Sequence, residues 1–476
     1  MAKIDVATVE DREDLLLQNL LQRRLAGTSA YVAVGQVALL VFNFALLAIL
    51  ARYLSLRDLG IYTILMEMGR IVSLFCQAGT TQGSQKFLGR LVYSNPSILP
   101  VVQRRMFVVL LAASTITVVV CALGWKVVTH AMFHNQGIAD LGFFGCVIII
   151  VTALQAYYAA VLLAANHMLQ SILSSGLVQK ALLLIGVAAL YWLDMTSAHL
   201  MSVLWAWIVS GLASVAFGAT FVEYRMWRLR GSQSSSAASL VPGFRELIST
   251  SLPMGVTAGM AMVRNSADVI IVGAVLGSAS AGVYGPLRSV ANLVLFLDQA
   301  IRRSVPAMIA ASIGKRDITE RLCRSAASYG VLAALLPTVV LVCCGGQVLA
   351  LVFGPKFSNY GGLAAILTGG AFLSGLFGAA SSLLQMSGYE RRAMYVNMAV
   401  TIVSIAIMPF AGASYGLDGV AYISSGFLVL QGVLLMWLAY CLIRVRTYVD
   451  VRYLAEGFSS AVRVVAGMFH VSFVRK

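Results

Sequence analysis

The chain has 476 residues, of which 59% are hydrophobic and 11% are charged, and its formal net charge is +15 at pH 7. Soluble globular proteins carry about 25% charged residues. This composition therefore excludes a soluble globular protein and indicates a polytopic membrane protein.

The N-terminal segment 1–27 is polar and is expected to contain no signal peptide. Within it, Leu17, Leu20, Leu21 and Leu25 recur at helical spacing among charged residues. This pattern predicts an amphipathic helix on the cytoplasmic surface of the membrane. An unstructured polar tail is the alternative for this segment.

Twelve long apolar stretches follow, and each can cross a hydrocarbon core that needs about 20 helical residues. They lie at 28–51, 59–80, 106–128, 142–165, 173–193, 200–222, 249–274, 279–301, 326–353, 360–386, 393–413 and 417–443. The predicted fold class is therefore all-α: a polytopic inner-membrane protein with about 12 transmembrane helices. The C-terminal segment 444–476 carries too many charges for another span, and we expect a cytoplasmic amphipathic tail.

The basic residues predict the orientation of these helices. If both termini are cytoplasmic, 26 of the 34 Lys and Arg residues lie on the cytoplasmic side and four on the opposite side. This asymmetry follows the positive-inside rule for a bacterial inner membrane. Attraction of the basic face to anionic membrane lipids accounts for the net charge, so no nucleic-acid partner is expected.

An internal repeat divides the spans into two halves. Four pairs of segments recur in the same order at offsets of 220 to 222: GIY 60–62 with GVY 282–284, VVVCALG 118–124 with VLVCCGG 340–346, MF 132–133 with VF 352–353, and LLAANHMLQ from 162 with LLQMSGYER from 383. Six spans separate the copies, so both halves have the same membrane orientation. The prediction is two six-helix lobes, 28–222 and 249–443, around a central cavity, joined by a cytoplasmic linker at 223–248.

Several segments resemble those of a known family of flippases. They are SLPMGVTAGM at 251–260, DVIIVGAVLGSASAGVYGPLRSV at 268–290, LALVFGPKFSNYGGLAAIL at 349–367 and LLQMSGYERRAMYVNMAV at 383–400. Together they are similar to Wzx-like polysaccharide flippases of the multidrug/oligosaccharidyl-lipid/polysaccharide exporter superfamily. One departure is Val269, which stands where that family often carries a basic residue.

The resemblance implies a function. Such flippases turn an undecaprenyl-diphosphate-linked oligosaccharide from the cytoplasmic to the periplasmic leaflet, for exopolysaccharide, capsule or O-antigen (lipopolysaccharide) assembly. The expected substrate is a lipid-linked glycan, and a glycan polymerase and a chain-length regulator are further expected partners.

Four basic residues fall inside the predicted spans: Arg70, Lys180, Arg264 and Arg288. A lipid diphosphate needs cations to cross hydrocarbon, and the arginine fork binds phosphate oxygens in two places. We therefore predict these four side chains as the substrate-binding residues. Arg288 and Lys180 have no acid within one helical turn; snorkelling of Arg288 and an interfacial position of Lys180 are the alternatives.

The other two cations each have an acid nearby on the same helix. Glu67 precedes Arg70 by three residues, and Asp268 follows Arg264 by four, so both sets fit intrahelical ion pairs. We assign Arg264 to the cavity, and Asp268 and Glu67 to structural or coupling roles, with Asp268 bracing neighbouring helices. Arg264 and Arg288 should lie at similar depth, near the bilayer midplane, and approach each other without being locked to acids.

Other functions are less compatible with the sequence. A cation-coupled multidrug exporter of the same superfamily is expected to carry an acid in the first span, and 28–51 contains none. A glycan polymerase or ligase predicts long periplasmic loops, whereas these connections are short. The seven cysteines lack metal-ligand spacing, and no phosphate-binding Gly-Lys loop or nucleophile elbow is present, so we expect no enzyme, cofactor or metal site. Coupling to protons, sodium or the membrane potential stays open.

Overall fold

The structure is a computed structural model, and it describes most of the chain. The described residues are 35, 37–94, 96–133, 137–165, 167–192, 199–230, 243–302, 309, 316–377 and 379–449. The predicted N-terminal amphipathic helix, the central part of the predicted linker and most of the predicted tail lie outside these residues.

Helices account for nearly all of the described chain, which contains no strand. The first half comprises Val37–Tyr53, α2 (Leu56–Gln77), α3 (Thr80–Ser94), α4 (Leu99–Phe133), α5 (Gly142–Ala164), α6 (Met168–Ile172), a π-helical turn (Leu173–Leu177), α7 (Val178–Trp192) and α8 (His199–Arg230), with 3₁₀ turns at Pro96–Ile98 and Ala139–Leu141. The second half comprises α9 (Phe244–Leu276), α10 (Ser278–Arg302), α12 (Arg316–Phe353), a 3₁₀ helix (Pro355–Tyr360), α13 (Gly361–Gly375), α14 (Ala380–Met386) and α15 (Glu390–Ile443).

Each of the twelve predicted stretches overlaps a helix of the described chain, so the all-α polytopic fold is confirmed. Among the described residues, seven helices are individually long and apolar enough to cross a membrane, and the segment from Pro355 to Met386, bent by 42°, gives an eighth. The 54-residue α15 would be about 81 Å long if it were straight, far more than the roughly 30 Å core of a bilayer. It breaks at Gly416, with φ 65° and ψ −145°, and thereby supplies the last two predicted spans.

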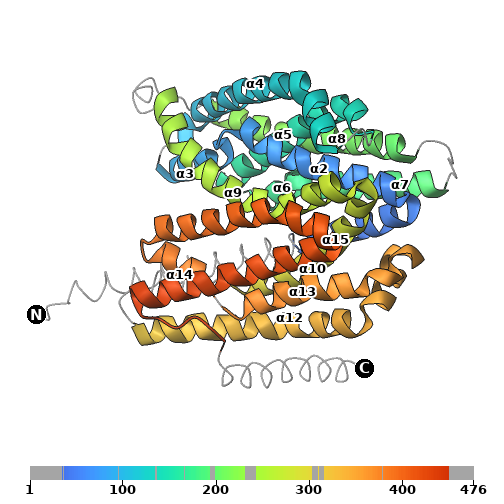
Figure 1. Cartoon of the computed structure of the whole chain (residues 1–476). Helices are drawn as coiled ribbons and strands as arrows, with labels where there is room; N and C mark the ends of the chain where they lie inside the picture. Colours follow the sequence, from blue (N-terminus) through green and yellow to red (C-terminus); the bar gives the residue numbers. More distant parts are fainter. Residues whose placement is uncertain are drawn as a thin grey trace, which may run out of the picture.

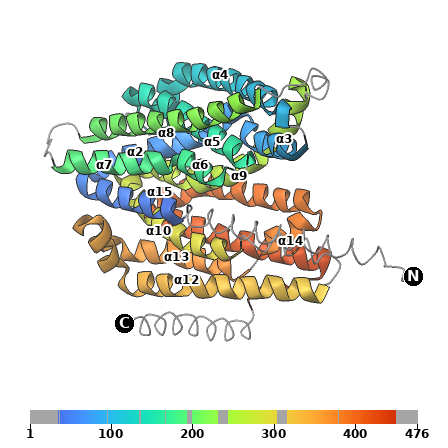
Figure 2. The same ribbon diagram turned by 180° about the vertical axis from the view of Figure 1, so that it is seen from behind.

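The helices of the two halves form two groups (Figures 1 and 2). In Figure 1 the helices α2 to α8 lie in the upper group, whereas α10 to α15 lie in the lower group, and α9 lies where the two groups meet. Helix α9 packs against α2, α3 and α4 of the first half and against α10 and α15 of the second. It therefore connects the groups physically as well as along the chain.

The repeated GIY and GVY segments meet where α2 and α10 begin. A Cβ atom added to Gly60 would lie 2.9 Å from the backbone nitrogen of Gly282, and one added to Gly282 would lie 2.9 Å from that of Gly60. The same added atoms would overlap the carbonyl groups of Ser278 and Leu56, respectively. Gly60 precedes Gly282 by 222 residues, and Leu56 precedes Ser278 by the same number. The contact is therefore reciprocal, as a two-fold relation between the halves requires. We call this contact the glycine seam.

A second reciprocal contact joins the halves near the same end. The Arg52 side chain, at the end of the first helix, donates to the carbonyl oxygens of Val352 (3.1 Å) and Leu351 at the end of α12. Lys356, just after α12, donates to the carbonyl oxygen of Leu54 at 3.4 Å. Because carbonyls at helix C-termini lack intrahelical donors, each half supplies a cation that caps a helix of the other.

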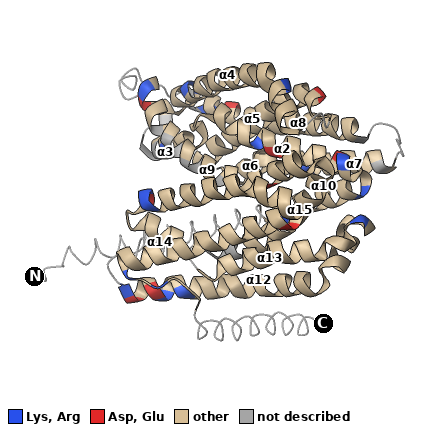
Figure 3. Ribbon diagram, viewed as in Figure 1, with Lys and Arg blue, Asp and Glu red and all other residues tan. Residues whose placement is uncertain are grey.

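Charged side chains concentrate at the helix ends (Figure 3). Arg316, Asp317, Glu320, Arg321 and Arg324 lie in the first turns of α12, at the left end of the view, while few charges lie along the middle of the bundle.

Candidate functional site

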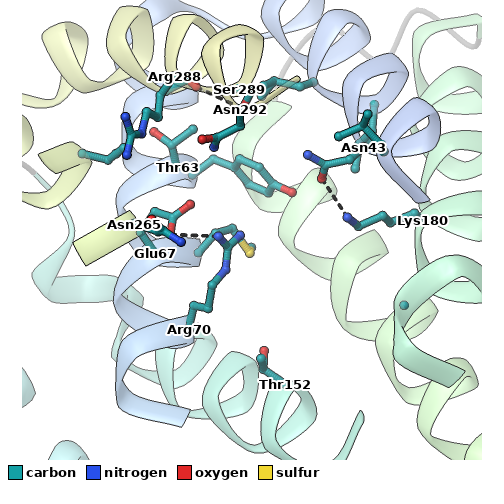
Figure 4. A pocket seen from close by; sticks show the side chains of 18 of the residues that line it. Asn43, Thr63, Glu67, Arg70, Thr152, Lys180, Asn265, Arg288, Ser289 and Asn292 are labelled. Carbon is teal, nitrogen blue, oxygen red and sulfur yellow. Dashed lines mark hydrogen bonds and ion pairs between the residues drawn. The ribbon is translucent and has the colours of Figure 1, made fainter. Parts of the chain in front are cut away.

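A cavity of about 630 Å³ lies between the two halves of the protein, and side chains from both halves line it (Figure 4). Its walls come from the first helix, α2, α5, the π-helical turn, α7 and α8 of the first half, and from α9, α10 and α15 of the second. Five of the six predicted site residues line it: Glu67, Arg70, Lys180, Arg264 and Arg288. The structure thus gathers these residues from four helices around one space.

Asp268, the sixth predicted residue, is fully buried behind the cavity wall. Its Oδ2 atom lies 3.1 Å from Nε of Arg288. The same oxygen accepts hydrogen bonds from Tyr284 Oη and Ser424 Oγ, each at 3.3 Å. The carboxylate therefore connects α9 with α10 and α15, and an ion buried with these partners avoids most of the cost of leaving water.

This pairing corrects the prediction for Arg288. The sequence indicated a guanidinium group without an acid, because no acid lies within one turn along its own helix. The structure pairs it with Asp268 across the α9–α10 contact, and Arg288 is only 8% exposed. Sequence spacing reveals neighbours on one helix, whereas this neighbour comes from the packing of two helices.

Arg264 does not pair with Asp268, although the two residues are four apart. Its Nη1 donates to the side-chain oxygen of Gln431 on α15, and Gln431 Nε2 in turn donates to Asn397 Oδ1. The Nε atom of Arg264 is buried and has no hydrogen-bond partner among the described residues. Arg264 is therefore a cation held by a neutral amide, with an unused donor.

The remaining two cations differ from each other. Arg70 forms an ion pair with Glu67 at 3.1 Å, so the intrahelical alternative is observed, while 46% of its side chain stays accessible. Lys180 Nζ donates to Asn43 Oδ1 at 2.9 Å, and no acid contacts it among the described residues. Together with Asp268 the site holds four cations and two carboxylates, a net charge of +2.

Sequence reasoning missed most of the uncharged polar side chains of the cavity. Asn43, Thr152, Gln155, Gln179, Asn265 and Asn292 all line it. Their signal in the sequence was an amide or hydroxyl side chain within an apolar span, where an unpaired polar group is costly. The π-helical turn in the fifth predicted span was also missed; its Gly176 lies at the cavity wall with φ 119°. A helix interrupted in this way beside a cavity is typical of transporter binding sites.

In the described parts of the chain, no three His, Cys, Asp or Glu side chains come together as metal ligands would. The polar groups at the site are four cations, two carboxylates that each pair with one of them, and several amides and hydroxyls. The cations, amides and hydroxyls are the groups left to bind a substrate. These groups bind anions and hydroxyl-rich molecules.

Several solved membrane transporters align with this structure. An inward-facing multidrug resistance MATE family transporter of the MOP superfamily aligns with a TM-score of 0.68 and 14% identity, over 85% of this chain and 94% of that chain. The inward closed lipid II flippase MurJ aligns with a TM-score of 0.65 and 11% identity, over 92% of each chain. A MOP superfamily transporter from Pyrococcus furiosus aligns with a TM-score of 0.58 and 13% identity, over 87% of this chain and 94% of that chain. At these identities the likeness shows the fold.

Sequence comparison supplies the family. A search of curated protein sequences finds no match. The family described as polysaccharide biosynthesis protein matches residues 49–361, which is more than half of the chain. The protein therefore belongs to this polysaccharide biosynthesis family and has the fold of the MOP superfamily transporters.

Proposed function

We propose that this protein is a flippase that turns an undecaprenyl-diphosphate-linked oligosaccharide from the cytoplasmic to the periplasmic leaflet of the inner membrane. The proposal rests on the hydrogen-bond partners of Lys180 and Arg264. Both line the cavity, and their hydrogen-bond partners are amide oxygens rather than carboxylates. The flipped glycan would serve exopolysaccharide, capsule or O-antigen assembly.

An amide-held cation suits a site that must bind and release an anion. A carboxylate would compete with the substrate phosphate for the same charge, whereas an amide oxygen positions the cation and leaves its charge uncompensated. When a diphosphate enters the cavity, each cation exchanges its neutral amide partner for a charged phosphate oxygen. Hydrogen bonds between two charged groups are about twice as strong as those between neutral groups. Arg264 and Lys180 would bind the phosphates, with Arg70 assisting from its accessible side.

Arg288 takes a different role in this proposal. Its charge is matched by Asp268, so it contributes a donor surface to the cavity wall, and the pair braces α9, α10 and α15. The +2 charge of the site also repels cationic drugs, which disfavours the alternative of a multidrug exporter.

The transport cycle would expose the cavity alternately to each side, with both termini in the cytoplasm and the basic helix ends facing anionic lipid. A bound anionic substrate moving outward is assisted by a negative-inside potential, by about 2.3 kcal/mol per charge per 100 mV. A glycan polymerase would then consume the flipped substrate.

A deletion strain tests this function. We expect the cells to accumulate lipid-linked glycan in the cytoplasmic leaflet, to lose the surface polysaccharide, and to keep normal sensitivity to cationic drugs. Expression of the wild-type protein should reverse both glycan defects. Unchanged glycan levels together with increased drug sensitivity would contradict the flippase and support the exporter.

A further inference from the structure

An amide chain in the first half of the protein forms part of the cavity wall. Gln179 Nε2 donates to the carbonyl oxygen of Trp207 at 3.4 Å, and Gln155 Nε2 donates to Gln179 Oε1 at 2.9 Å. Gln155 and Gln179 are only 7% and 5% exposed, yet both line the cavity. The chain therefore runs from α8 through α7 to α5 and ends at Gln155.

The chemistry of this chain fixes its direction. A backbone carbonyl only accepts hydrogen bonds, so Gln179 must turn its NH₂ group toward Trp207. The Gln179 oxygen must then accept from the NH₂ group of Gln155, which leaves Gln155 Oε1 as the terminal atom. No described residue donates to that oxygen, so the amide chain ends at the cavity in a hydrogen-bond acceptor that is available to a ligand.

A hydroxyl group lies beside this acceptor. Thr152 lines the cavity and precedes Gln155 by three residues on α5, which places both on one face of the helix. Figure 4 shows Thr152 on the side of the cavity where Arg70 lies. A polar, uncharged patch of Thr152 and Gln155 thus adjoins the cationic part of the cavity.

We infer that Gln155 and Thr152 form the subsite for the first sugar of the substrate, and that this sugar is uncharged. The inference rests on the proposed function, which places the diphosphate against Arg264 and Lys180. A sugar hydroxyl or an N-acetyl N–H donates to Gln155 Oε1, and the Thr152 hydroxyl both donates and accepts. The carboxylate of a uronic acid only accepts, so at Gln155 Oε1 it would place two acceptors against each other, with the Thr152 hydroxyl as the one donor of the subsite.

Binding of short prenyl analogues to the purified full-length protein tests the subsite. The probes are farnesyl diphosphate, its glucose-linked form and its glucuronic-acid-linked form. We expect the glucose-linked form to bind more tightly than the other two. Gln155→Leu should weaken glucose-linked binding roughly fivefold to tenfold, the effect of about one hydrogen bond, without changing farnesyl diphosphate binding. Thr115→Val, which alters an exposed hydroxyl on α4, is the matched control.

The outcomes separate the subsite from the proposed function. Equal binding of farnesyl diphosphate with and without glucose would overturn the subsite while leaving the cation site intact. Equal binding of the glucose and glucuronic acid forms would overturn the preference for an uncharged sugar. Failure of all three probes to bind the wild-type protein would instead refute the proposed function. If Gln155→Leu does not fold, Thr152→Val must show the same selective loss for the inference to stand.

Discussion

Replacing Gly60 with alanine should shift the protein toward the state that opens to the periplasm. The glycine seam holds the starts of α2 and α10 together. In the proposed orientation these helix starts face the periplasm, so we expect the periplasmic opening of the cavity to require their separation. An added Cβ would lie 2.5 Å from the carbonyl carbon of Ser278 and 2.9 Å from the nitrogen of Gly282. Optimal separation of non-bonded carbon atoms is about 3.5–4.0 Å, and the added atom would overlap the Ser278 carbonyl oxygen still more severely, so the helices must move apart by more than about 1 Å.

The size of the shift follows from the cost of overpacking. Inserting a methyl group where backbone atoms cannot move aside costs about 1–3 kcal/mol. That cost applies only to the closed seam, so it favours the separated state about 5- to 150-fold. Gly282→Ala should act in the same direction because its contact is the reciprocal one.

Accessibility of the cavity to a thiol reagent measures the shift. Asn292→Cys, in a protein whose native cysteines have been replaced, places a single thiol at the cavity wall. A membrane-impermeant maleimide added from the periplasm should label it faster when Gly60→Ala is present. Gly426→Ala, where an added Cβ has no neighbour within 4 Å, is the control. Identical labelling rates in well-folded Gly60→Ala and Gly426→Ala proteins would refute this role of the seam.

Three further predictions concern charged groups. Arg264→Ala should abolish glycan export at a normal protein level, and Arg264→Lys should restore only part of it because lysine lacks the planar fork; full export by Arg264→Ala would exclude this cation from phosphate binding. Arg288→Ala should lower the amount of folded protein, because it leaves the buried Asp268 without a cation at a cost of about 3–5 kcal/mol. Adding Asp268→Asn should recover part of this loss. Immunoblots and thermal unfolding measure both effects, and a normal amount of folded Arg288→Ala protein would contradict the bracing role. Burial, and to a smaller extent Arg225, lowers the pKa of His167 below its ordinary 6.5. The unfolded chain then binds the proton more readily than the folded protein, so the melting temperature should fall as the pH drops through about 6.5. His167→Gln should lessen that fall, and the same pH dependence in this variant as in the wild-type protein would contradict the prediction.

The sequence determined the membrane fold and the chemical character of the cavity. Hydrocarbon makes apolar stretches long and charges within them rare, so the twelve apolar stretches and the four cations within them were both visible without a structure. The repeat at an offset of 222 likewise identified Gly60 and Gly282 as equivalent positions before their contact was known.

Only the tertiary structure decided which partners Arg264 and Arg288 have. Arg288 pairs with Asp268 from the neighbouring helix, and Arg264 contacts Gln431, 167 residues away. The amide chain that ends at Gln155 likewise joins three helices. Helical spacing predicts contacts within one helix because its geometry is fixed, whereas contacts between helices depend on how the helices cross and rotate against each other. Arg264 and Asp268 are suitably spaced on one helix, yet packing turns them toward different partners.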